Sequence, residues 1–268
     1  MIDNPRSPRV RSVAKLAKRD ARVQTGFFLL EGPQAVAEAL AFRPELLVEL
    51  FATPTALDRY SNLAQDAEDA EIDIEFVTEH VLESMADTVT PQGVIAVCRQ
   101  FPTSVKDIFS DEPRLIAILE EVRDPGNAGT IIRAADAAGA DGVIFTGRSV
   151  DLYNPKVVRA TTGSLFHLPV AFGAELESVL ERASAAGIRV LAADIKGEDL
   201  LAARTEGVLD GPTAWLFGNE ARGLSDEHYA LADRAIAVPI YGKAESMNLA
   251  TAASVCLYES AFAQRAAR

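Results

Sequence analysis

Short apolar runs alternate with amphipathic stretches along the chain. In the N-terminal third, four runs have the length of buried strands: FFLL (27–30), LVELF (47–51), IEFV (74–77) and VIAV (94–97). Helical spacing is found between them at PQAVAEALAF, which opens at Pro33, and over 56–70 and 78–85, where Thr78 is a suitable N-cap. This order predicts a small α/β domain.

The alternation is stronger in the C-terminal half. Five apolar runs predict strands here: LIAIL (115–119), VIF (143–145), VLAAD (190–194), AWLF (214–217) and AIAVPI (235–240). Helical segments separate them, a pattern typical of a parallel sheet with helices on both faces. The last segment, SMNLATAASVCLYESAFAQRAAR, has apolar residues at 3,4 spacing, which predicts a closing helix that packs on the body or on a partner subunit.

The stretch between the two halves has no sustained periodicity and carries Pro102 and Pro113. It is therefore the predicted linker. We expect a domain at 1–100, a linker at 101–113 and a larger domain at 114–268.

Composition narrows the class of protein. Of the 268 residues, 49% are hydrophobic, yet no run approaches the roughly 18 apolar residues of a membrane span, and the N-terminus lacks the apolar run of a secretory signal. A soluble cytoplasmic protein is expected. Cys98 and Cys256 lie in apolar contexts, which favours buried thiols over a disulfide, and the three scattered histidines suggest no metal site.

Charge is distributed unevenly along the chain. The net charge is −13, which taken alone argues against a nucleic-acid partner. Residues 1–24, however, hold seven Lys and Arg against two Asp, so this arm carries +5 and the remaining chain −18. A basic arm on an acidic body indicates contact with a polyanion, although a solvated basic helix face is the alternative.

Three strand-to-helix turns carry polar groups where ligands bind in parallel sheets, beyond the carboxyl ends of the strands. They are EEVRDPGNAGTIIRAADAAGA after LIAIL, GNEARGLS after AWLF, and YGKAESMNLATAAS after AIAVPI. Each has a purely structural alternative, since Pro-Gly turns are common, Glu220 could be a surface glutamate and Ser246 an ordinary helix cap. Asn248 is harder to dismiss, because asparagine is a modest helix former at an apolar helix start. Gly218 is interpreted as letting a ligand approach the main chain.

Taken together and in order, these turns resemble the three signature motifs of the SpoU/TrmH branch of the SPOUT superfamily, the knotted RNA methyltransferases. The stretch YNPKVVRATTGSLFHLPV (153–170) is similar to the segment between the motifs, and residues 8–97 resemble the L30e-like substrate domain of that branch. Met247 stands where leucine is usual, and Ala134 and Ala135 where a small hydroxyl residue is frequent. Neither departure removes a functional side chain, so the resemblance implies an active enzyme.

The resemblance implies a deep trefoil knot in the C-terminal domain, S-adenosylmethionine as cofactor, no metal, a homodimer, and methylation of a ribose 2′-hydroxyl in RNA. The implied cofactor-binding residues are Leu216, Phe217, Gly218, Val238, Ile240 and Met247. The implied catalytic residues are Arg133, Asn127, Glu220, Ser246 and Asn248. A guanidinium is always protonated, so Arg133 is expected to hold phosphate and stabilise the developing oxyanion, while Glu220 fixes Arg133 or the motif loops.

RNA contacts are expected from the basic arm and from the segment between the motifs. The expected RNA-binding residues are Arg9, Arg11, Lys15, Arg22, Lys156 and Arg159, with a solvated helix face as the alternative for the last two. The accessory N-terminal domain favours 23S ribosomal RNA as the substrate over transfer RNA. The target nucleotide, the proton acceptor and the choice between a housekeeping and an antibiotic-resistance role stay open.

Two other classes of function share some features of this sequence. A Rossmann oxidoreductase is disfavoured because no G-x-G-x-x-G follows the first strand of the C-terminal half, and the next strand ends VIFTG without a carboxylate. A non-catalytic RNA-binding or ribosome-assembly protein shares the basic arm, and failure to bind S-adenosylmethionine would favour it.

Overall fold

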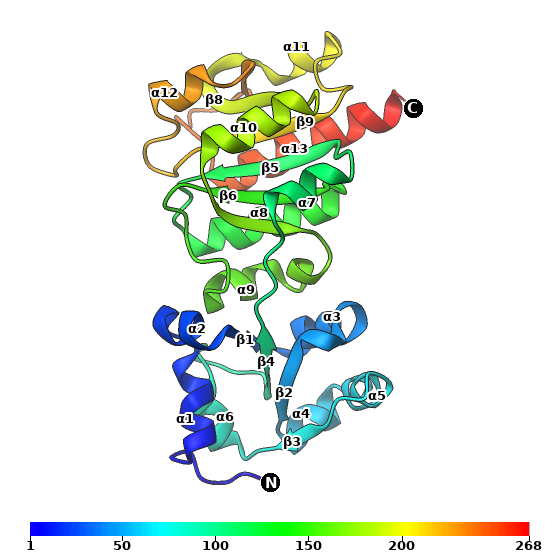
Figure 1. Cartoon of the computed structure of the whole chain (residues 1–268), viewed down its shortest axis with the longest axis vertical. Coiled ribbons are helices and arrows are strands. Elements are labelled where there is room, and N and C mark those ends of the chain that lie inside the picture. Colours follow the sequence, from blue (N-terminus) through cyan, green and yellow to red (C-terminus); the bar gives the residue numbers. More distant parts are fainter. Residues whose placement is uncertain (268) are drawn as a thin grey trace. The chain divides into compact units, whose positions relative to one another are not determined.

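The computed structural model describes residues 1–267 and divides into two compact units, which are described separately (Figure 1). Unit 1 comprises Met1–Phe101 and Asp151–His167. Unit 2 comprises Pro102–Val150 and the chain from Leu168 onward. The chain therefore leaves unit 1 after Phe101, returns to it at Asp151 and leaves it again after His167.

Unit 1 is built on a four-stranded sheet with the order β1-β4-β2-β3. Its strands are β1 (Phe27–Glu31), β4 (Val94–Arg99), β2 (Leu47–Ala52) and β3 (Ile74–Phe76). β4 is antiparallel to both β1 and β2, and β3 is parallel to β2. All four strands lie where the apolar runs predict them.

Helices cover this sheet. They are α1 (Pro8–Lys15), α2 (Arg19–Thr25), α3 (Pro33–Phe42), α4 (Pro54–Arg59), α5 (Asn62–Asp69), α6 (Glu79–Met85) and α9 (Pro155–Thr161). Two short 3-10 turns accompany them at Pro44–Leu46 and Ser164–Phe166. The Thr78 hydroxyl accepts a hydrogen bond from Val81 N, as expected of the predicted cap. The single helix predicted over 56–70 is instead two, α4 and α5, because the backbone of Tyr60, the C-cap of α4, leaves the helical conformation.

The N-terminal arm is part of the unit 1 core. Val10, Val13 and Leu16 of α1 pack with α6 and with the side chains of the sheet on that face. α1 is therefore an amphipathic helix whose apolar side is buried, and its cations Arg9, Arg11 and Lys15 are exposed.

Unit 2 contains a six-stranded, wholly parallel sheet with the order β10-β8-β9-β5-β6-β7. The strands are β5 (Leu115–Glu120), β6 (Gly142–Thr146), β7 (Val170–Ala174), β8 (Arg189–Asp199), β9 (Thr213–Phe217) and β10 (Arg234–Ala237). β7 was not predicted, because this edge strand is short, exposes Phe172 and contains Gly173 at positive φ. The central strands β5 and β9 are buried throughout, as a sheet covered on both faces requires.

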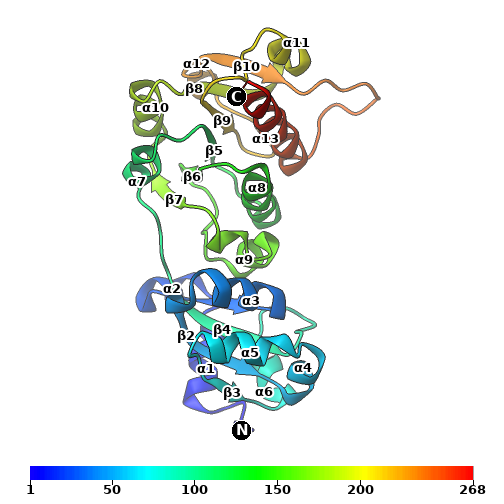
Figure 2. The ribbon, with the colours of Figure 1, turned by 90° about the vertical axis from the view of Figure 1, so that its right-hand side faces the viewer.

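Helices lie on both faces of this sheet (Figure 2). α7 (Val105–Ser110) and α10 (Leu176–Ala185) cover one face, and α8 (Pro125–Ala138) packs beside α13 (Leu249–Ala266) on the other. Two shorter helices, α11 (Leu200–Thr205) and α12 (Asp226–Ala230), complete the unit. Buried Trp215 donates its indole N–H to Ser260 Oγ at 2.8 Å and so anchors α13 on β9.

The stretch predicted as a linker is more structured than its composition suggested. It contains α7, whose Ile108 is 2% exposed and lies in the same apolar core as Ile116 and Ile144. A helix of six residues is too short to show a clear period in the sequence, which is why 101–113 looked irregular.

The segment Asp151–His167 belongs to unit 1 by its contacts, although it lies inside the predicted C-terminal domain. Tyr153 is buried, its ring packs 4.8 Å from that of Phe28, and its hydroxyl accepts a hydrogen bond from Phe101 N at 2.7 Å. Burial raises the pKa of the Tyr153 hydroxyl. These contacts join residues more than fifty positions apart, and local sequence patterns do not report them.

Both cysteines are buried and unpaired, as predicted, and burial raises the pKa of each thiol. Between residues 1 and 267, no helix combines the length and apolarity needed to cross a membrane. The same residues contain no group of three or more His, Cys, Asp or Glu placed to bind a metal ion.

Candidate active site

The candidate site lies at one edge of the unit 2 sheet. Because all six strands are parallel, their carboxyl ends share this edge, and the loops after β5, β8, β9 and β10 emerge there. Three of these loops are the sequence motifs identified above.

The first motif forms the start of α8. Asp124 is the N-cap, and its Oδ1 accepts a hydrogen bond from Asn127 N at 2.7 Å, while Pro125 occupies the first helical position. The cap fixes the backbone of Asn127 on the first turn.

Glu220, from the second motif, holds the first motif in place. Its two carboxylate oxygens accept hydrogen bonds from Arg123 N at 3.2 Å and Asp124 N at 2.9 Å. Asn127 Nδ2 also lies 3.5 Å from Glu220 Oε1. Of the two expected roles of Glu220, this geometry supports fixing the motif loops.

Asn248, from the third motif, completes the network. Its Nδ2 donates to Asn127 Oδ1 at 2.9 Å, and its Oδ1 accepts from Ala250 N and Thr251 N at the start of α13. Asn248 is therefore the N-cap of α13, whereas Ser246 precedes the helix and does not cap it. Asn127, Glu220 and Asn248, which are far apart in sequence, meet at one place.

The main chain itself gives a reason for glycine at position 218. Asn219 and Gly223 form a tight hairpin through two backbone hydrogen bonds, 3.1 and 2.8 Å long. A Cβ on Gly218 would lie 2.5 Å from the carbonyl carbon of Gly223, so the hairpin itself requires glycine. The predicted approach of a ligand to Gly218 stays a prediction.

A cavity opens beside this network. Its lining residues come from the middle of β8, from β9, β10 and the loops that follow them, and from the start of α13: Ala193, Asp194, Ile195, Phe217, Asn219, Glu220, Ile236, Val238, Ile240, Ser246, Met247, Leu249 and Ala252. Four predicted cofactor-binding residues, Phe217, Val238, Ile240 and Met247, are among them. Leu216 is not, because its side chain points into the buried core with Ile116 and Ile118.

The sequence interpretation missed the wall formed by β8, directly beyond Ala192, its last residue paired with β9. Ala193, Asp194 and Ile195 line the cavity, whereas the run VLAAD was interpreted only as a strand. The available signal was Asp194 itself, a carboxylate that ends an apolar run in a parallel sheet.

Arg133 lies on α8, six residues beyond Asn127, at an exposed position. It is not among the described residues that line the cavity of this chain. Its predicted role at the reaction centre stays a prediction.

The predicted RNA-binding residues differ in exposure and in whether their charged groups already pair with carboxylates. Arg22 is 3% exposed, pairs with Asp151 at 2.6 Å and donates to the carbonyls of Leu16 and Ala17. This buried guanidinium holds α2 and Asp151 together, which disfavours the predicted RNA contact. The sequence did not reveal this, since Asp151 lies 129 positions away.

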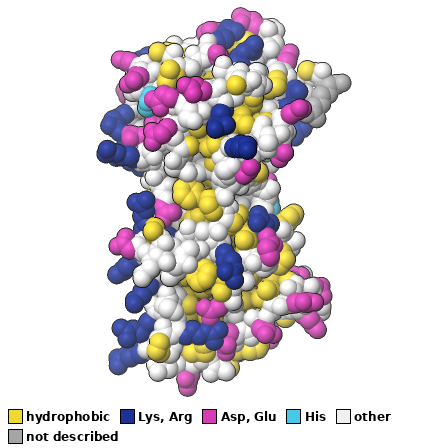
Figure 3. All heavy atoms as spheres, in the orientation of Figure 1, with side chains coloured by type: hydrophobic (Ala, Val, Ile, Leu, Met, Phe, Trp, Pro, Cys, Tyr) yellow, Lys and Arg dark blue, Asp and Glu magenta, His cyan; other side chains and the backbone are white. Residues whose placement is uncertain are grey.

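Arg159 and Arg9 are also engaged by carboxylates. Arg159 pairs with buried Glu31 at 2.5 Å and with Asp87 at 2.9 Å, and Arg9 pairs with two glutamates of the sheet. Arg11, Lys15 and Lys156 are exposed. Figure 3 shows Lys and Arg side chains gathered along the edge of unit 1 that carries α1 and α2.

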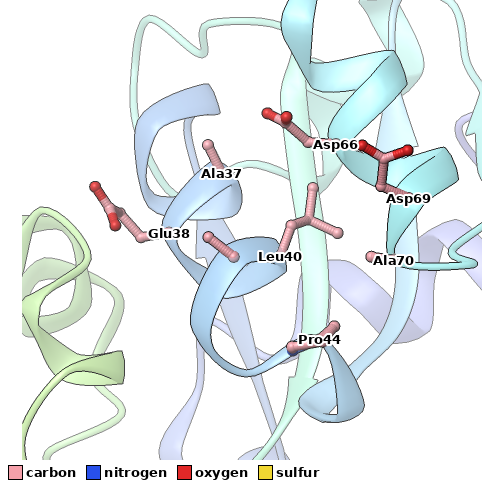
Figure 4. Close-up of a pocket in the computed structure, with 8 residues that line it drawn as sticks. Ala37, Glu38, Leu40, Pro44, Asp66, Asp69 and Ala70 are labelled. Carbon is pink, nitrogen blue, oxygen red and sulfur yellow. The ribbon is translucent and has the colours of Figure 1, made fainter.

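A larger hollow, of about 490 Å³, lies in unit 1 between α3 and α5. Its lining includes three carboxylates, Glu38 on α3 and Asp66 and Asp69 on α5, and Figure 4 shows the two aspartates on the α5 side. A concentration of negative charge opposes phosphate binding, and none of the three motifs contributes to this hollow. The cavity in unit 2 is therefore the better candidate, although it is smaller.

Comparison with known proteins agrees with the motifs. Residues 114–258 match the model of the SpoU rRNA Methylase family, and residues 29–104 match that of the RNA 2′-O ribose methyltransferase substrate-binding domain. The chain is 31% identical over 257 residues to the 23S rRNA (guanosine(2553)-2′-O)-methyltransferase RlmP of Bacillus subtilis, covering 96% of this chain and 97% of the relative. It is 32% identical over 253 residues to the 23S rRNA (uridine(2479)-2′-O)-methyltransferase of Streptomyces viridochromogenes, covering 92% and 86%.

A solved structure shares the whole fold. The AdoMet-bound rRNA methyltransferase from Sinorhizobium meliloti superposes with a TM-score of 0.83 at 32% identity and covers 97% of this chain and 96% of that one. The fold, the site and the matches define an S-adenosylmethionine-dependent methyltransferase that acts on a ribose 2′-hydroxyl of RNA. The chain belongs to the SpoU rRNA methylase family. The Rossmann and non-catalytic interpretations are thereby set aside.

Proposed function

We propose that this enzyme methylates a ribose 2′-hydroxyl of 23S ribosomal RNA. The observation that carries the proposal is the hydrogen-bonded network of Asn127, Glu220 and Asn248 beside an apolar cavity. The two relatives named above, both similar over most of the chain, act on 23S rRNA, which supports this substrate over transfer RNA. One acts on guanosine and the other on uridine, so the base is left open.

The cavity suits S-adenosylmethionine. Ile236, Val238, Ile240 and Met247 provide an apolar surface for a nucleobase. The charged side chains among the described lining residues are the carboxylates Asp194 and Glu220, which suit a ligand with a positively charged sulfonium. When bound, the cofactor supplies a methyl group activated by that sulfonium.

The residues of the chain then have distinct roles in the proposal. Asn127 orients the ribose, Glu220 keeps the Asn127 loop in position, and Asn248 positions the nucleotide and the third motif loop. Ser246 helps to position the nucleotide. Arg133, always protonated, holds phosphate and stabilises the negative charge that develops on the ribose oxygen.

We also propose that the enzyme is a cytoplasmic homodimer. Tyr241, in the loop between β10 and α13, is 85% exposed, and Phe262 on α13 is 50% exposed. Figure 2 shows this loop extending from β10 toward α13. Large apolar side chains at such exposure favour a covering subunit. The trefoil path belongs to the same proposal, because the ends of β8 and β9 share one cavity with the loop that follows β10.

The exposed cations of α1 and α2 are expected to bind the RNA backbone. Replacing Lys15 and Lys18 with Ala should weaken binding to 23S rRNA and reduce the slope of log affinity against log salt by about 0.7 to 0.9 for each phosphate that is no longer neutralised. Filter binding across a salt series measures this. The control is the double variant Lys106→Ala/Arg182→Ala, which removes two exposed cations from α7 and α10. Equal slopes in both double variants would exclude the basic arm as a surface that binds RNA phosphates.

Deleting residues 1–24 is not a suitable test of the arm. The deletion would remove Val10, Val13 and Leu16 from the core of unit 1. Loss of binding would then report unfolding rather than loss of charge.

Mapping of ribose methylation tests the function itself. Ribosomal and transfer RNA from cells with and without the gene should differ at one ribose of 23S rRNA. Restoration by the wild-type gene confirms the assignment, and a difference confined to transfer RNA overturns the choice of substrate.

A further inference from the structure

We propose that Asp194 binds the ribose hydroxyls of S-adenosylmethionine and thereby selects a ribonucleoside cofactor. The inference rests on the assignment of the unit 2 cavity to the cofactor. Three observations carry it: an irregularity in β8, the state of the other polar side chains in the cavity, and the environment of the Asp194 carboxylate.

β8 leaves the regular ladder where it meets β10. Ala192 pairs with Ala235, yet the next residue of β10, Ile236, pairs with Glu198, so residues 193–197 have no partners in β10. Such an excursion redirects side chains that would otherwise alternate across the sheet. Asp194 and Ile195 reach the cavity for this reason.

Gly197 closes the excursion. A Cβ at this position would lie 2.5 Å from backbone atoms of both Ala235 and Ile236. The strand can return to the ladder only because glycine lets the two backbones touch. The bulge is thus fixed by contacts, and Asp194 is held at the cavity wall.

Most polar side chains of the cavity already have partners in the protein. Asn219 donates to Glu121 O and accepts from Ala221 N and Arg222 N. Both carboxylate oxygens of Glu220 accept hydrogen bonds from backbone N–H groups, as described above. This leaves Asp194 and the exposed Ser246 hydroxyl as groups that can bind a ligand through side-chain oxygens.

Among residues 1–267, only one oxygen of the Asp194 carboxylate has a hydrogen-bond donor. Its Oδ1 accepts a hydrogen bond from Lys196 N at 2.9 Å, which fixes the orientation of the side chain. Within residues 1–267, Oδ2 has no hydrogen-bond donor, and it lies toward the Asn219–Gly223 hairpin, 3.8 Å from where a Cβ of Gly223 would be. Because Oδ2 is held in a fixed orientation at the cavity wall, we expect it to accept a hydrogen bond from the ligand.

The ligand offers donors at the matching place. In S-adenosylmethionine the ribose joins the flat apolar adenine to the sulfonium group, and its two neighbouring hydroxyls are donors. Asp194 lines the same cavity as the apolar residues Ile236 and Val238 and as Glu220 of the polar network. A carboxylate that follows a parallel strand is a well-known partner of a nucleotide ribose.

Calorimetry with S-adenosylhomocysteine and its 2′-deoxy and 3′-deoxy analogues tests the proposal on the full-length protein. The wild type should bind the parent compound at least about tenfold more tightly than one of the two deoxy analogues, because a hydrogen bond to a charged group is lost. In Asp194→Ala this ratio should fall close to one, and in Asp194→Asn, which keeps an acceptor, it should lie between. An unchanged ratio in Asp194→Ala overturns the proposal.

Two further variants separate the inference from its premise. Asp226→Asn removes one exposed carboxylate from α12, outside the cavity, and should leave the ratio as in the wild type. Ala252→Phe fills the cavity from α13 and should abolish binding of S-adenosylhomocysteine while thermal unfolding stays cooperative. If Ala252→Phe still binds S-adenosylhomocysteine with wild-type affinity, the assignment of the cavity to the cofactor is wrong. If Ala252→Phe loses binding but the Asp194 variants keep the wild-type ratio, only the ribose contact is wrong.

Discussion

Arg133→Ala should lower the rate of methyl transfer by about 100-fold or more and leave cofactor affinity unchanged, since preorganised positive charge at a developing oxyanion is worth this much. Cofactor affinity should persist because Arg133 is not among the described residues that line the cavity. Single-turnover methylation of 23S rRNA measures the rate, and calorimetry with S-adenosylhomocysteine measures binding.

Two variants complete this experiment. Arg182→Ala makes the same change at an exposed site on α10 and should methylate at the normal rate. Arg133→Lys keeps the charge but loses the planar donor fork, so an intermediate rate is expected. An Arg133→Ala enzyme of normal rate would remove Arg133 from the proposed mechanism.

Arg22→Ala should destabilise the protein by about 3 kcal/mol or more, because it leaves a partly buried carboxylate and two carbonyls without their donor. Asp151 is 19% exposed, and Arg22 also donates to Leu16 O and Ala17 O. Urea unfolding followed by circular dichroism measures the loss. The matched control Arg19→Ala changes an exposed cation of the same helix and should cost little.

The same pair of variants separates folding from RNA binding. If Arg22 binds RNA directly, Arg22→Ala would unfold at the wild-type urea concentration and show a reduced salt slope. The buried ion pair predicts the opposite result, a lower unfolding midpoint at every salt concentration.

Much of the fold followed from periodicity. Within residues 1–267, nine of the ten strands lie at predicted apolar runs, and the motifs were placed at the correct ends of β5, β9 and β10. The missing strand β7 and the helix α7 are short elements at the margin of the sheet, where neither length nor burial leaves a clear pattern.

The sequence predicted those residues of the site that belong to the three motifs. Asn127, Glu220 and Asn248 do converge, as expected. Asp194 was missed because it depends on a register shift between β8 and β10, and the burial of Arg22 because it depends on Asp151. Both are tertiary contacts between distant segments, which local patterns do not encode.

The return of the chain to unit 1 at Asp151–His167 bears on how enzymes of this kind can be recombined. A chimera joined at a single point near residue 101 would bring a foreign version of this segment to a native N-terminal unit. The foreign residues at positions 151 and 159 would then lie opposite native residues with which they did not evolve, a cation at position 22 and a carboxylate at position 31. Functional exchange of substrate specificity therefore requires that α9 and its flanking residues be transplanted together with the N-terminal unit.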